Sequence, residues 1–243
     1  MIELRETTID DDARLAEIAR EGDSADASPA YFAFVRTSGS LLAAADGGLV
    51  IGFAGMVPVG EAAMVTDLYV AAVSRGHGVG GRLLGALLDG WPQRMTFSSS
   101  HPLAMPAYQS AGMEPRWRLR YLSGRAVGGG LPLVPARWRH DRADLVEHFR
   151  AEGAIVGHDI VVHVGTRGAV VERLVSDRPE AEMHWLLEAL PSGTTVWCRV
   201  PEHRPLAGWL EKRGFWVNEH DTFLSSPGVD LDPGVSCVHA GLL

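Results

Sequence analysis

Lysine, cysteine and long hydrophobic runs are scarce in this chain of 243 residues. Lys212 is the only lysine among 22 basic residues, and we interpret this as genome composition, because arginine keeps the same charge. Two cysteines, Cys198 and Cys237, are too few for a disulfide framework or a zinc cage. The longest apolar stretch without a charge, Gly47–Gly60, is too short to cross a bilayer.

The charge balance excludes a further class of partner. Thirty acidic residues against 22 basic ones give a net charge of −8, spread along the chain without a basic stripe, so we expect no nucleic-acid partner. The hydrophobic share of 46% is enough for a sizeable core. The first residues include Glu3 and Arg5, where a signal peptide would be apolar. These features predict a cytoplasmic protein with no membrane partner.

Strand and helix signals alternate through the first half of the chain, which predicts an α/β fold. Asp10, Asp11 and Asp12 place acid at a helix start, where the helix dipole favours it. Leu15, Ile18 and Ala19 form the apolar stripe of that helix. The other expected elements are strands at Ile2–Glu6, Leu41–Ala45, Leu49–Val57, Ala63–Ala72, Arg94–Ser100 and Trp117–Leu122, and helices at Ala30–Arg36 and Pro102–Ala111.

A glycine- and proline-rich segment divides the chain. Gly128–Gly130, followed by Pro132 and Pro135, is typical of a linker. We therefore expect a first domain at 1–125, a linker at 126–136 and a second domain at 137–243.

The second half repeats the first in a weakened form. At an offset of 102 residues, four positions are identical: His101, Gly112, Leu122 and Ser123 match His203, Gly214, Leu224 and Ser225. Upstream the register continues if four residues are dropped, so that Ala63 faces Ala169. The dropped residues fall in a glycine-rich turn of the first half. The matched order of elements favours a duplication whose second copy is degenerate.

That turn, at residues 74–88, follows a strand and opens an apolar helix, an arrangement that suits a bound anion. Gly76, Gly78 and Gly81 satisfy the dinucleotide pattern G-x-G-x-x-G, but no acidic residue follows about 20 positions later to bind a ribose. This disfavours a nucleotide-dependent oxidoreductase. No lysine follows the last glycine, so a Walker loop is excluded.

The segment Arg75-x-x-Gly78-x-Gly80 resembles the [Arg/Gln]-x-x-Gly-x-[Gly/Ala] motif of the GNAT acyltransferase superfamily. Asp67–Val70 resembles the fourth strand of that family, and 101–113 resembles its Asn-x-x-Ala-x-x-[Leu/Phe]-Tyr-x-x-x-Gly-Phe signature. The resemblance covers residues 2 to about 124 well. It implies a GNAT fold with a mixed, mostly antiparallel central sheet, followed by a second, degenerate GNAT-like domain.

The resemblance also implies a site for acetyl-CoA as cosubstrate. The coenzyme-binding positions carried over are Leu68, Tyr69, Val70, Arg75, Gly76, His77, Gly78, Val79, Gly80, Gly81, His101 and Ala104. The glycine-turn amides would hold the pyrophosphate, and the strand backbone would pair with the pantetheine arm. His101 stands where the family usually has asparagine. No histidine lies at metal-ligand spacing from acids or cysteines, so we expect no metal.

Two residues are candidates for catalysis by the same resemblance. Tyr108 occupies the position of the general acid that protonates the departing thiolate, a role that its motif position and residue type favour over a ring packed in the core with its hydroxyl at the surface. Asp67 lies where related enzymes place an acid facing the acceptor, and strand alternation leaves the direction of its side chain open. Tyr31, Phe32 and Phe34 lie where the family builds its acceptor wall, a pattern that also suits a core.

These residues imply an N-acetyltransferase that moves an acetyl group from acetyl-CoA to a primary amine of a small molecule or peptide. We expect direct attack in a ternary complex, because no nucleophile for a covalent intermediate stands out. The alternative is an acyl-CoA-binding regulator or sensor on the same scaffold. The sequence leaves the acceptor, the acyl length and the oligomeric state open.

Overall fold

The computed structural model describes residues 1–22, 27–99 and 101–242. They divide into two compact units. The first comprises Met1–Pro115 and Leu224–Val229, and the second comprises the rest. The division at Pro115 precedes the domain end expected at residue 125, and the first unit recruits a short segment from near the end of the chain.

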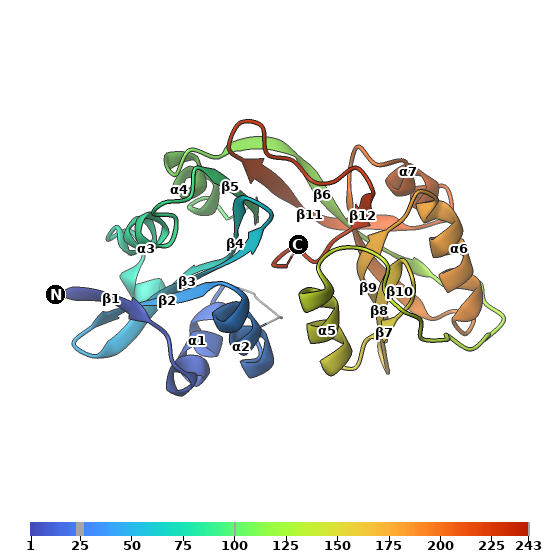
Figure 1. Cartoon of the computed structure of the whole chain (residues 1–243), viewed down its shortest axis with the longest axis horizontal. Coiled ribbons are helices and arrows are strands. Elements are labelled where there is room, and N and C mark those ends of the chain that lie inside the picture. Colours follow the sequence, from blue (N-terminus) through green and yellow to red (C-terminus); the bar gives the residue numbers. More distant parts are fainter. Residues whose placement is uncertain (23–26, 100, 243) are drawn as a thin grey trace. The chain divides into compact units, whose positions relative to one another are not determined.

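The first unit alternates helices and strands in the expected order (Figure 1). Its elements are β1 (Ile2–Glu6), η1 (Ile9–Asp11), α1 (Asp12–Arg20), α2 (Pro29–Ser38), β2 (Ser40–Asp46), β3 (Leu49–Val59), β4 (Ala62–Val70), η2 (Ala72–Ser74), α3 (Val79–Leu87), β5 (Gln93–Ser98) and α4 (Ala104–Ser110).

The sheet of the first unit runs in the order β1-β2-β3-β4-β5. The pairs up to β3–β4 are antiparallel, and β4–β5 is parallel. Figure 1 shows α1 and α2 on one face of this sheet and α3 and α4 on the other. The end of strand β11 (Trp216–Ser225), from the second half of the chain, continues this unit beyond β5. Just after that strand, the backbone N–H of Ser226 donates to the Arg94 carbonyl at 2.9 Å.

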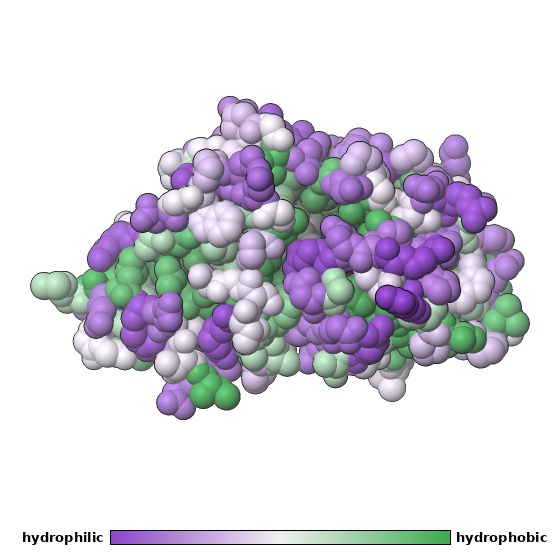
Figure 2. Space-filling view, in the orientation of Figure 1, coloured by the Kyte–Doolittle hydropathy of each residue, from purple (hydrophilic) through white to green (hydrophobic). Residues whose placement is uncertain are grey.

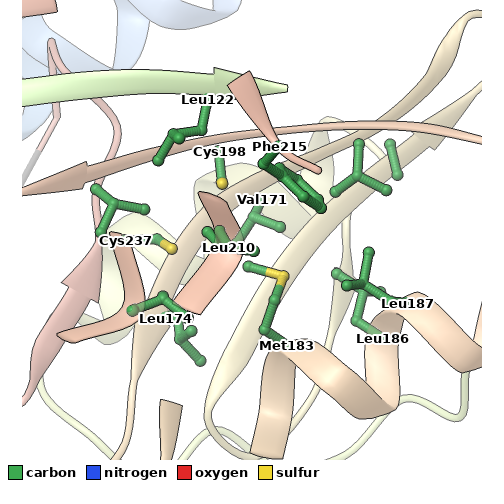
Figure 3. Close-up of a cluster of buried hydrophobic side chains, with 14 of the residues drawn as sticks. Leu122, Val171, Leu174, Met183, Leu186, Leu187, Cys198, Leu210, Phe215 and Cys237 are labelled. Carbon is green, nitrogen blue, oxygen red and sulfur yellow. The ribbon is translucent and has the colours of Figure 1, made fainter. Parts of the chain in front are cut away.

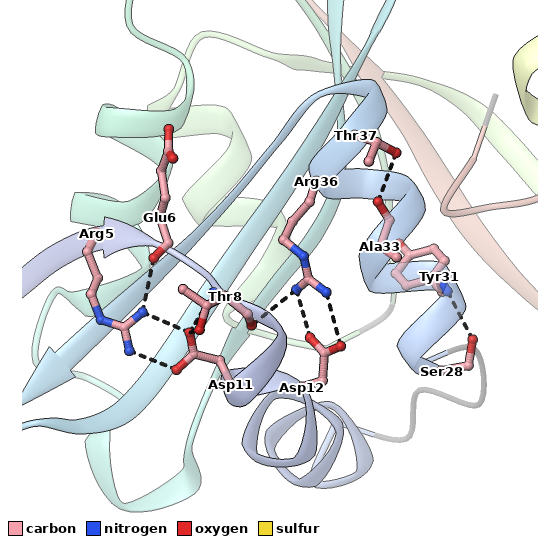
Figure 4. Close-up of polar contacts among 10 residues, drawn as sticks. All are labelled: Arg5, Glu6, Thr8, Asp11, Asp12, Ser28, Tyr31, Ala33, Arg36 and Thr37. Atoms are coloured by element: carbon pink, nitrogen blue, oxygen red, sulfur yellow. Dashed lines mark hydrogen bonds and ion pairs between the residues drawn. The ribbon is translucent and has the colours of Figure 1, made fainter.

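Two bidentate ion pairs hold the first helices (Figure 4). Arg5 of β1 donates to both carboxylate oxygens of Asp11 at 2.7 and 2.8 Å. Arg36 of α2 donates to both oxygens of Asp12 at 2.7 and 3.0 Å. The acidic run thus does more than suit the helix dipole, because two of its carboxylates are buried tertiary partners.

The second unit has the elements β6 (Glu114–Arg125), α5 (Ala143–Ala151), β7 (Ile155–Val156), β8 (Ile160–Gly165), β9 (Gly168–Val175), α6 (Pro179–Ala189), β10 (Thr195–Pro201), α7 (Pro205–Glu211), β11 (Trp216–Ser225) and β12 (Val235–Cys237). Its strands run in the order β11-β6-β10-β9-β8-β7, with β12 also paired to β9. Among the strand pairs described for this unit, β9–β10 is parallel and the pairs β6–β10, β9–β12, β7–β8 and β8–β9 are antiparallel. The expected mixed, mostly antiparallel sheet is therefore confirmed.

The core of the second unit lies between its sheet and the helices α6 and α7. Leu186 and Leu187 of α6 and Leu210 of α7 pack against inward-facing residues of β9 and β10, such as Val171 and Cys198 (Figure 3). In Figure 2, hydrophilic side chains predominate over the second unit, whereas apolar side chains reach the surface over β1–β3 of the first.

The expected elements are present, with boundary shifts of a few residues. Ile2–Glu6 is a strand as expected. The helix expected from Pro102 begins at Ala104, and the strand expected at Arg94–Ser100 runs from Gln93 to Ser98. Ser100 itself lies outside the described residues.

Candidate active site

Strand β4 carries a bulge in its middle. Its register with β3 shifts so that Asp67 faces Gly55 while Val65 faces Met56, which leaves Thr66 as the extra residue. A bulge bends its strand and re-aims the side chains beyond it. The bulge therefore separates the first half of β4 from the segment expected to hold the coenzyme.

The backbone pairing between β4 and β5 ends at the same place. Their parallel pairing runs from Ala62–Gln93 to Val65–Thr96, whereas β3 stays paired with β4 as far as Val70. The Thr96 hydroxyl, which is 1% exposed, donates to the Val65 carbonyl at 3.0 Å at this point. One edge of β4 is thus released from its neighbour immediately before the predicted coenzyme segment.

The backbone groups on that released edge follow from strand alternation. The Ala71 N–H donates to the Ile51 carbonyl at 2.9 Å, and opposite residues of an antiparallel pair alternate between bonded and non-bonded pairs. Tyr69 therefore bonds toward β3, and the N–H groups of Leu68 and Val70 point toward the opening. The Val70 carbonyl already accepts a bond from Arg75 Nε at 2.9 Å.

The glycine-rich turn lies between η2 and α3. Gly76 and Gly78 have φ values of 79° and 76°, a left-handed conformation that side chains with a Cβ adopt rarely. Gly78 caps α3, and the first helical backbone bond in this region runs from the Arg82 N–H to the Gly78 carbonyl. The amides before it belong to the helix start, where no acceptor within the helix exists. A Cβ built on Gly76, Gly78 or Gly81 would meet nothing within 4 Å, so the space beside them is open.

These parts enclose a cavity of about 270 Å³. It is lined by Gly22, Leu68, Tyr69, Val70, Ser74, Arg75, Gly76, Gly78, Val79, Gly80, Ser99, His101, Leu103, Ala104 and Ala107. Ten of the fourteen predicted site residues are among them. His77, Gly81, Asp67 and Tyr108 are not. Ser74, Leu103 and Ala107 lie within the motif segments and could have been named from them, whereas nothing in the sequence points to Gly22.

His101 lies at the start of α4 on the cavity wall. Its Nδ1 accepts a hydrogen bond from the Leu103 N–H at 3.3 Å. This bond is local, since Leu103 lies two residues along the chain, and among the described residues no side-chain hydrogen bond caps α4.

Tyr108 lies on α4, one residue beyond the cavity-lining Ala107. Its side chain is 6% exposed and belongs to the apolar cluster that includes Leu83 and Leu84 of α3 and Met113. The ring therefore packs in the core, which is the alternative that the sequence offered beside the catalytic role.

Asp67 lies on the other face of β4 and is 6% exposed. Its Oδ2 accepts bonds from the Tyr31 hydroxyl and the Thr66 hydroxyl, each at 2.7 Å. Burial and the Asp67 charge raise the pKa of the Tyr31 phenol, which therefore remains a donor to this carboxylate. Tyr31 is held by the start of α2, where Ser28 accepts its backbone N–H at 3.0 Å (Figure 4).

The remaining aromatic residues of α2 are part of the core. Phe32 is fully buried and meets the Phe53 ring edge-on at 5.8 Å, and Phe34 is 8% exposed. Tyr69 lies on the same face, with its ring 5.4 Å from that of Phe53 and directly beside Gly22. Of the three predicted wall residues, Tyr31 is the one shown bonded to a candidate catalytic group.

The described part of the chain holds no cluster of three or more histidine, cysteine or acidic side chains arranged for a metal ion. None of its helices is both long enough and apolar enough to cross a membrane.

Comparison with known proteins relates this geometry to one family. Residues 7–113 match the model of the acetyltransferase (GNAT) family. No curated protein matches the sequence significantly.

Among solved structures, a candidate acetyltransferase from Pyrococcus horikoshii has a TM-score of 0.75 at 15% identity, over 99% of this chain and 95% of its own. A GCN5-related N-acetyltransferase from Anabaena variabilis has a TM-score of 0.56 at 13% identity, over 93% of this chain and 72% of its own. At these identities the likeness shows the α/β GNAT-like fold alone. The family match itself covers residues 7–113, a little less than half of the chain.

Proposed function

We propose that the first unit is an N-acetyltransferase that moves an acetyl group from acetyl-CoA to a primary amine in a ternary complex. One observation carries the proposal: a single cavity joins the glycine turn at the start of α3 to the released edge of β4. An anion site and a free strand edge in one cavity suit a ligand with a phosphate end and an amide-containing arm.

The coenzyme positions follow from this cavity. The amides of 76–81 would bind the pyrophosphate, since the glycines leave open space beside the helix start. The N–H groups of Leu68 and Val70 would bind the pantetheine arm and polarise the thioester carbonyl. His101 and Ala104 would line the opposite wall, and no metal is needed for these steps.

The reaction needs one proton acceptor and one proton donor. The amine nitrogen attacks the thioester carbonyl, the C–S bond breaks, and the sulfur leaves as a thiolate. Asp67, oriented by Tyr31 and Thr66, would take the proton from the amine directly or through water. Tyr108 would give its phenol proton to the thiolate, and its neighbour Ala107 lines the cavity.

We further propose that the second unit is a degenerate copy of the first. Under the alignment found in the sequence, Thr66 corresponds to Glu172, and the β8–β9 register skips Glu172 in the way that β3–β4 skips Thr66. The last parallel pair, Val65–Thr96, corresponds to Val171–Cys198, which is again the last pair. Two matching irregularities at aligned positions favour duplication over chance.

The second copy lacks the features that would bind coenzyme. Its turn is shorter, and α6 begins at Pro179 with the acids Glu180 and Glu182 in its first turn and Asp177 just before it. These like charges would repel a polyanion. Leu210 stands at the tyrosine position and is fully buried, and Arg173 replaces Asp67.

An acyl-CoA sensor is the second candidate, and the burial of Tyr108 outside the cavity lining favours it. Release of free thiol from acetyl-CoA in the presence of a panel of primary amines separates the two. Amine-dependent thiol release would support the enzyme. Tight binding of acetyl-CoA, with no thiol released in the presence of any of the amines, would support the sensor.

Because both cysteines are free thiols, we also propose a reducing, cytoplasmic setting.

A further inference from the structure

The second unit contains an opening between β9 and β10 that its own chain fills. These strands run parallel only from the pair Ala169–Val196 to the pair Val171–Cys198. Beyond that point the edge of β9 pairs with β12 instead, which sets Leu174 opposite Cys237. The other edge of β9 is still occupied by β8 in this region. The strand β12 therefore lies in the gap where β9 and β10 separate.

Backbone bonds fix β12 on both sides of the gap. The Ser176 N–H, just after β9, donates to the Gly234 carbonyl at 3.1 Å. The Val238 N–H donates to the Arg199 carbonyl of β10 at 3.2 Å. Cys237 and Val238 are fully buried. Because β12 is buried and its flanking backbone groups are hydrogen-bonded on both sides, it is an integral part of the fold of the second unit.

The opening in the first unit also arises where two parallel strands separate, but it forms a cavity and is not filled by a strand. There the edge Leu68–Val70 lines an open cavity, whereas the corresponding edge of β9 is covered by β12. The point of separation is the same in the alignment of the two halves, Val65–Thr96 against Val171–Cys198.

We propose that β12 is a built-in substitute for the coenzyme in the second unit, occupying the strand position that the pantetheine arm occupies in the first. This inference rests on the proposed function for its comparison with the first unit. Pantetheine is an extended chain with amide groups, so a peptide strand can satisfy the same backbone donors and acceptors. Because β12 is covalently attached, its effective concentration far exceeds that of a free ligand, and the second opening is closed to coenzyme.

The two cysteines make this closure measurable. Cys198 lies on β10 and Cys237 on β12, and both point into the cluster under the sheet (Figure 3). They are the only cysteines of the chain, so thiol labelling reports on this opening alone. Burial and the neighbouring Cys198 thiol raise the pKa of the Cys237 thiol, which keeps it protonated and slow to react.

The first arm of the test measures labelling of the full chain by an aromatic disulfide reagent. Val238→Pro removes the N–H that donates to Arg199, and Val238→Ala retains it while losing side-chain volume. We expect the proline variant to label at least about 10-fold faster than the alanine variant. Equal rates in two folded variants, or rapid labelling of the unmodified chain, would overturn the proposal.

The second arm measures amide hydrogen exchange of the unmodified chain with and without acetyl-CoA. It tests whether β12 closes the second opening even if the proline variant does not fold. We expect slow exchange at Ser176 and Val238 in both samples, and slowing by coenzyme only in the first unit. Fast exchange at these amides, or a coenzyme effect on β9 and β12, would contradict closure. If acetyl-CoA slows nothing at Leu68–Val70, the proposed function fails, while slow exchange in β12 still supports the closed opening.

Discussion

Asp67 of β4 and Tyr108 of α4 lie on opposite faces of the sheet of the first unit, and this separation suits their assigned roles. Asp67 lies with Tyr31 of α2 at 2.7 Å, whereas Tyr108 packs in the cluster under α3. A base and an acid that act on two ends of one reaction need not touch each other. Each has to reach the reacting atoms from its own side.

For Tyr108, replacement by phenylalanine deletes the proton and keeps the ring. If the phenol protonates the thiolate, kcat should fall about 10²–10⁴-fold. The dissociation constant of acetyl-CoA and the melting temperature should barely move, because no core volume is lost. A variant that keeps more than about half of the wild-type kcat would remove Tyr108 from the mechanism.

Asp11 gives a prediction about acid stability. The Arg5 guanidinium beside it lowers its pKa from 3.8 to about 2. A lowered pKa contributes stability that is fully present above the unfolded value, and this contribution is lost as the pH falls from 3.8 through about 2. Because the pair is partly exposed, we expect a loss of about 1 kcal/mol in the free energy of unfolding across that window.

Denaturant titrations at several acidic pH values test this expectation for Asp11. Asp11→Asn should be less stable than the wild type at neutral pH, and the difference should shrink toward pH 2. Asp46→Asn, which removes an exposed partner of the chain's first amino group, is the control and should be nearly neutral. A constant difference between Asp11→Asn and wild type at every pH would contradict the account.

At the scale of elements, the motif positions that depend on backbone geometry, such as Gly78 and Val70, lie together along one cavity. Their strand and turn could be predicted because glycine spacing and strand order are local signals, whereas their binding of coenzyme stays a prediction. The partner of Asp67 could not be read from the sequence, since Tyr31 reaches it from a distant helix. The bulge at Thr66, which decides where Asp67 points, likewise leaves no clear signal.

The start of α3 is the element on which coenzyme binding depends most. Gly78→Asp places a negative charge beside the proposed pyrophosphate, and Gly78→Asn is a matched control of similar size and similar tolerance for a left-handed backbone. We expect the aspartate variant to bind acetyl-CoA at least about 10-fold more weakly than the asparagine variant. Equal affinities of the two folded variants in calorimetry would exclude a phosphate at this turn.

At the scale of the whole molecule, the first compact unit contains segments from both halves of the chain. The sequence placed the end of the first domain at residue 125 because Gly128–Gly130 has the composition of a linker. The structure instead assigns Leu224–Val229 to the first unit. Such an assignment depends on which strands pair over long distances, and composition carries no information about that pairing.

Leu224 is therefore expected to stabilise the first unit despite its place near the end of the chain. It is fully buried in the cluster that contains Leu83 and Tyr108. Leu224→Ala should lower the free energy of unfolding by about 2–5 kcal/mol, and a fragment ending at Arg125 should be unstable. Denaturant titration and circular dichroism check both expectations. A fragment 1–125 as stable as the full chain would contradict the assignment of Leu224–Val229.

Calorimetric titration of the full chain with acetyl-CoA counts its coenzyme sites. We expect one coenzyme bound per chain, because the first unit has an open cavity at its glycine turn and the second unit has an acidic turn and an opening filled by β12. A reproducible stoichiometry of two per chain, or no binding at all, would contradict this expectation.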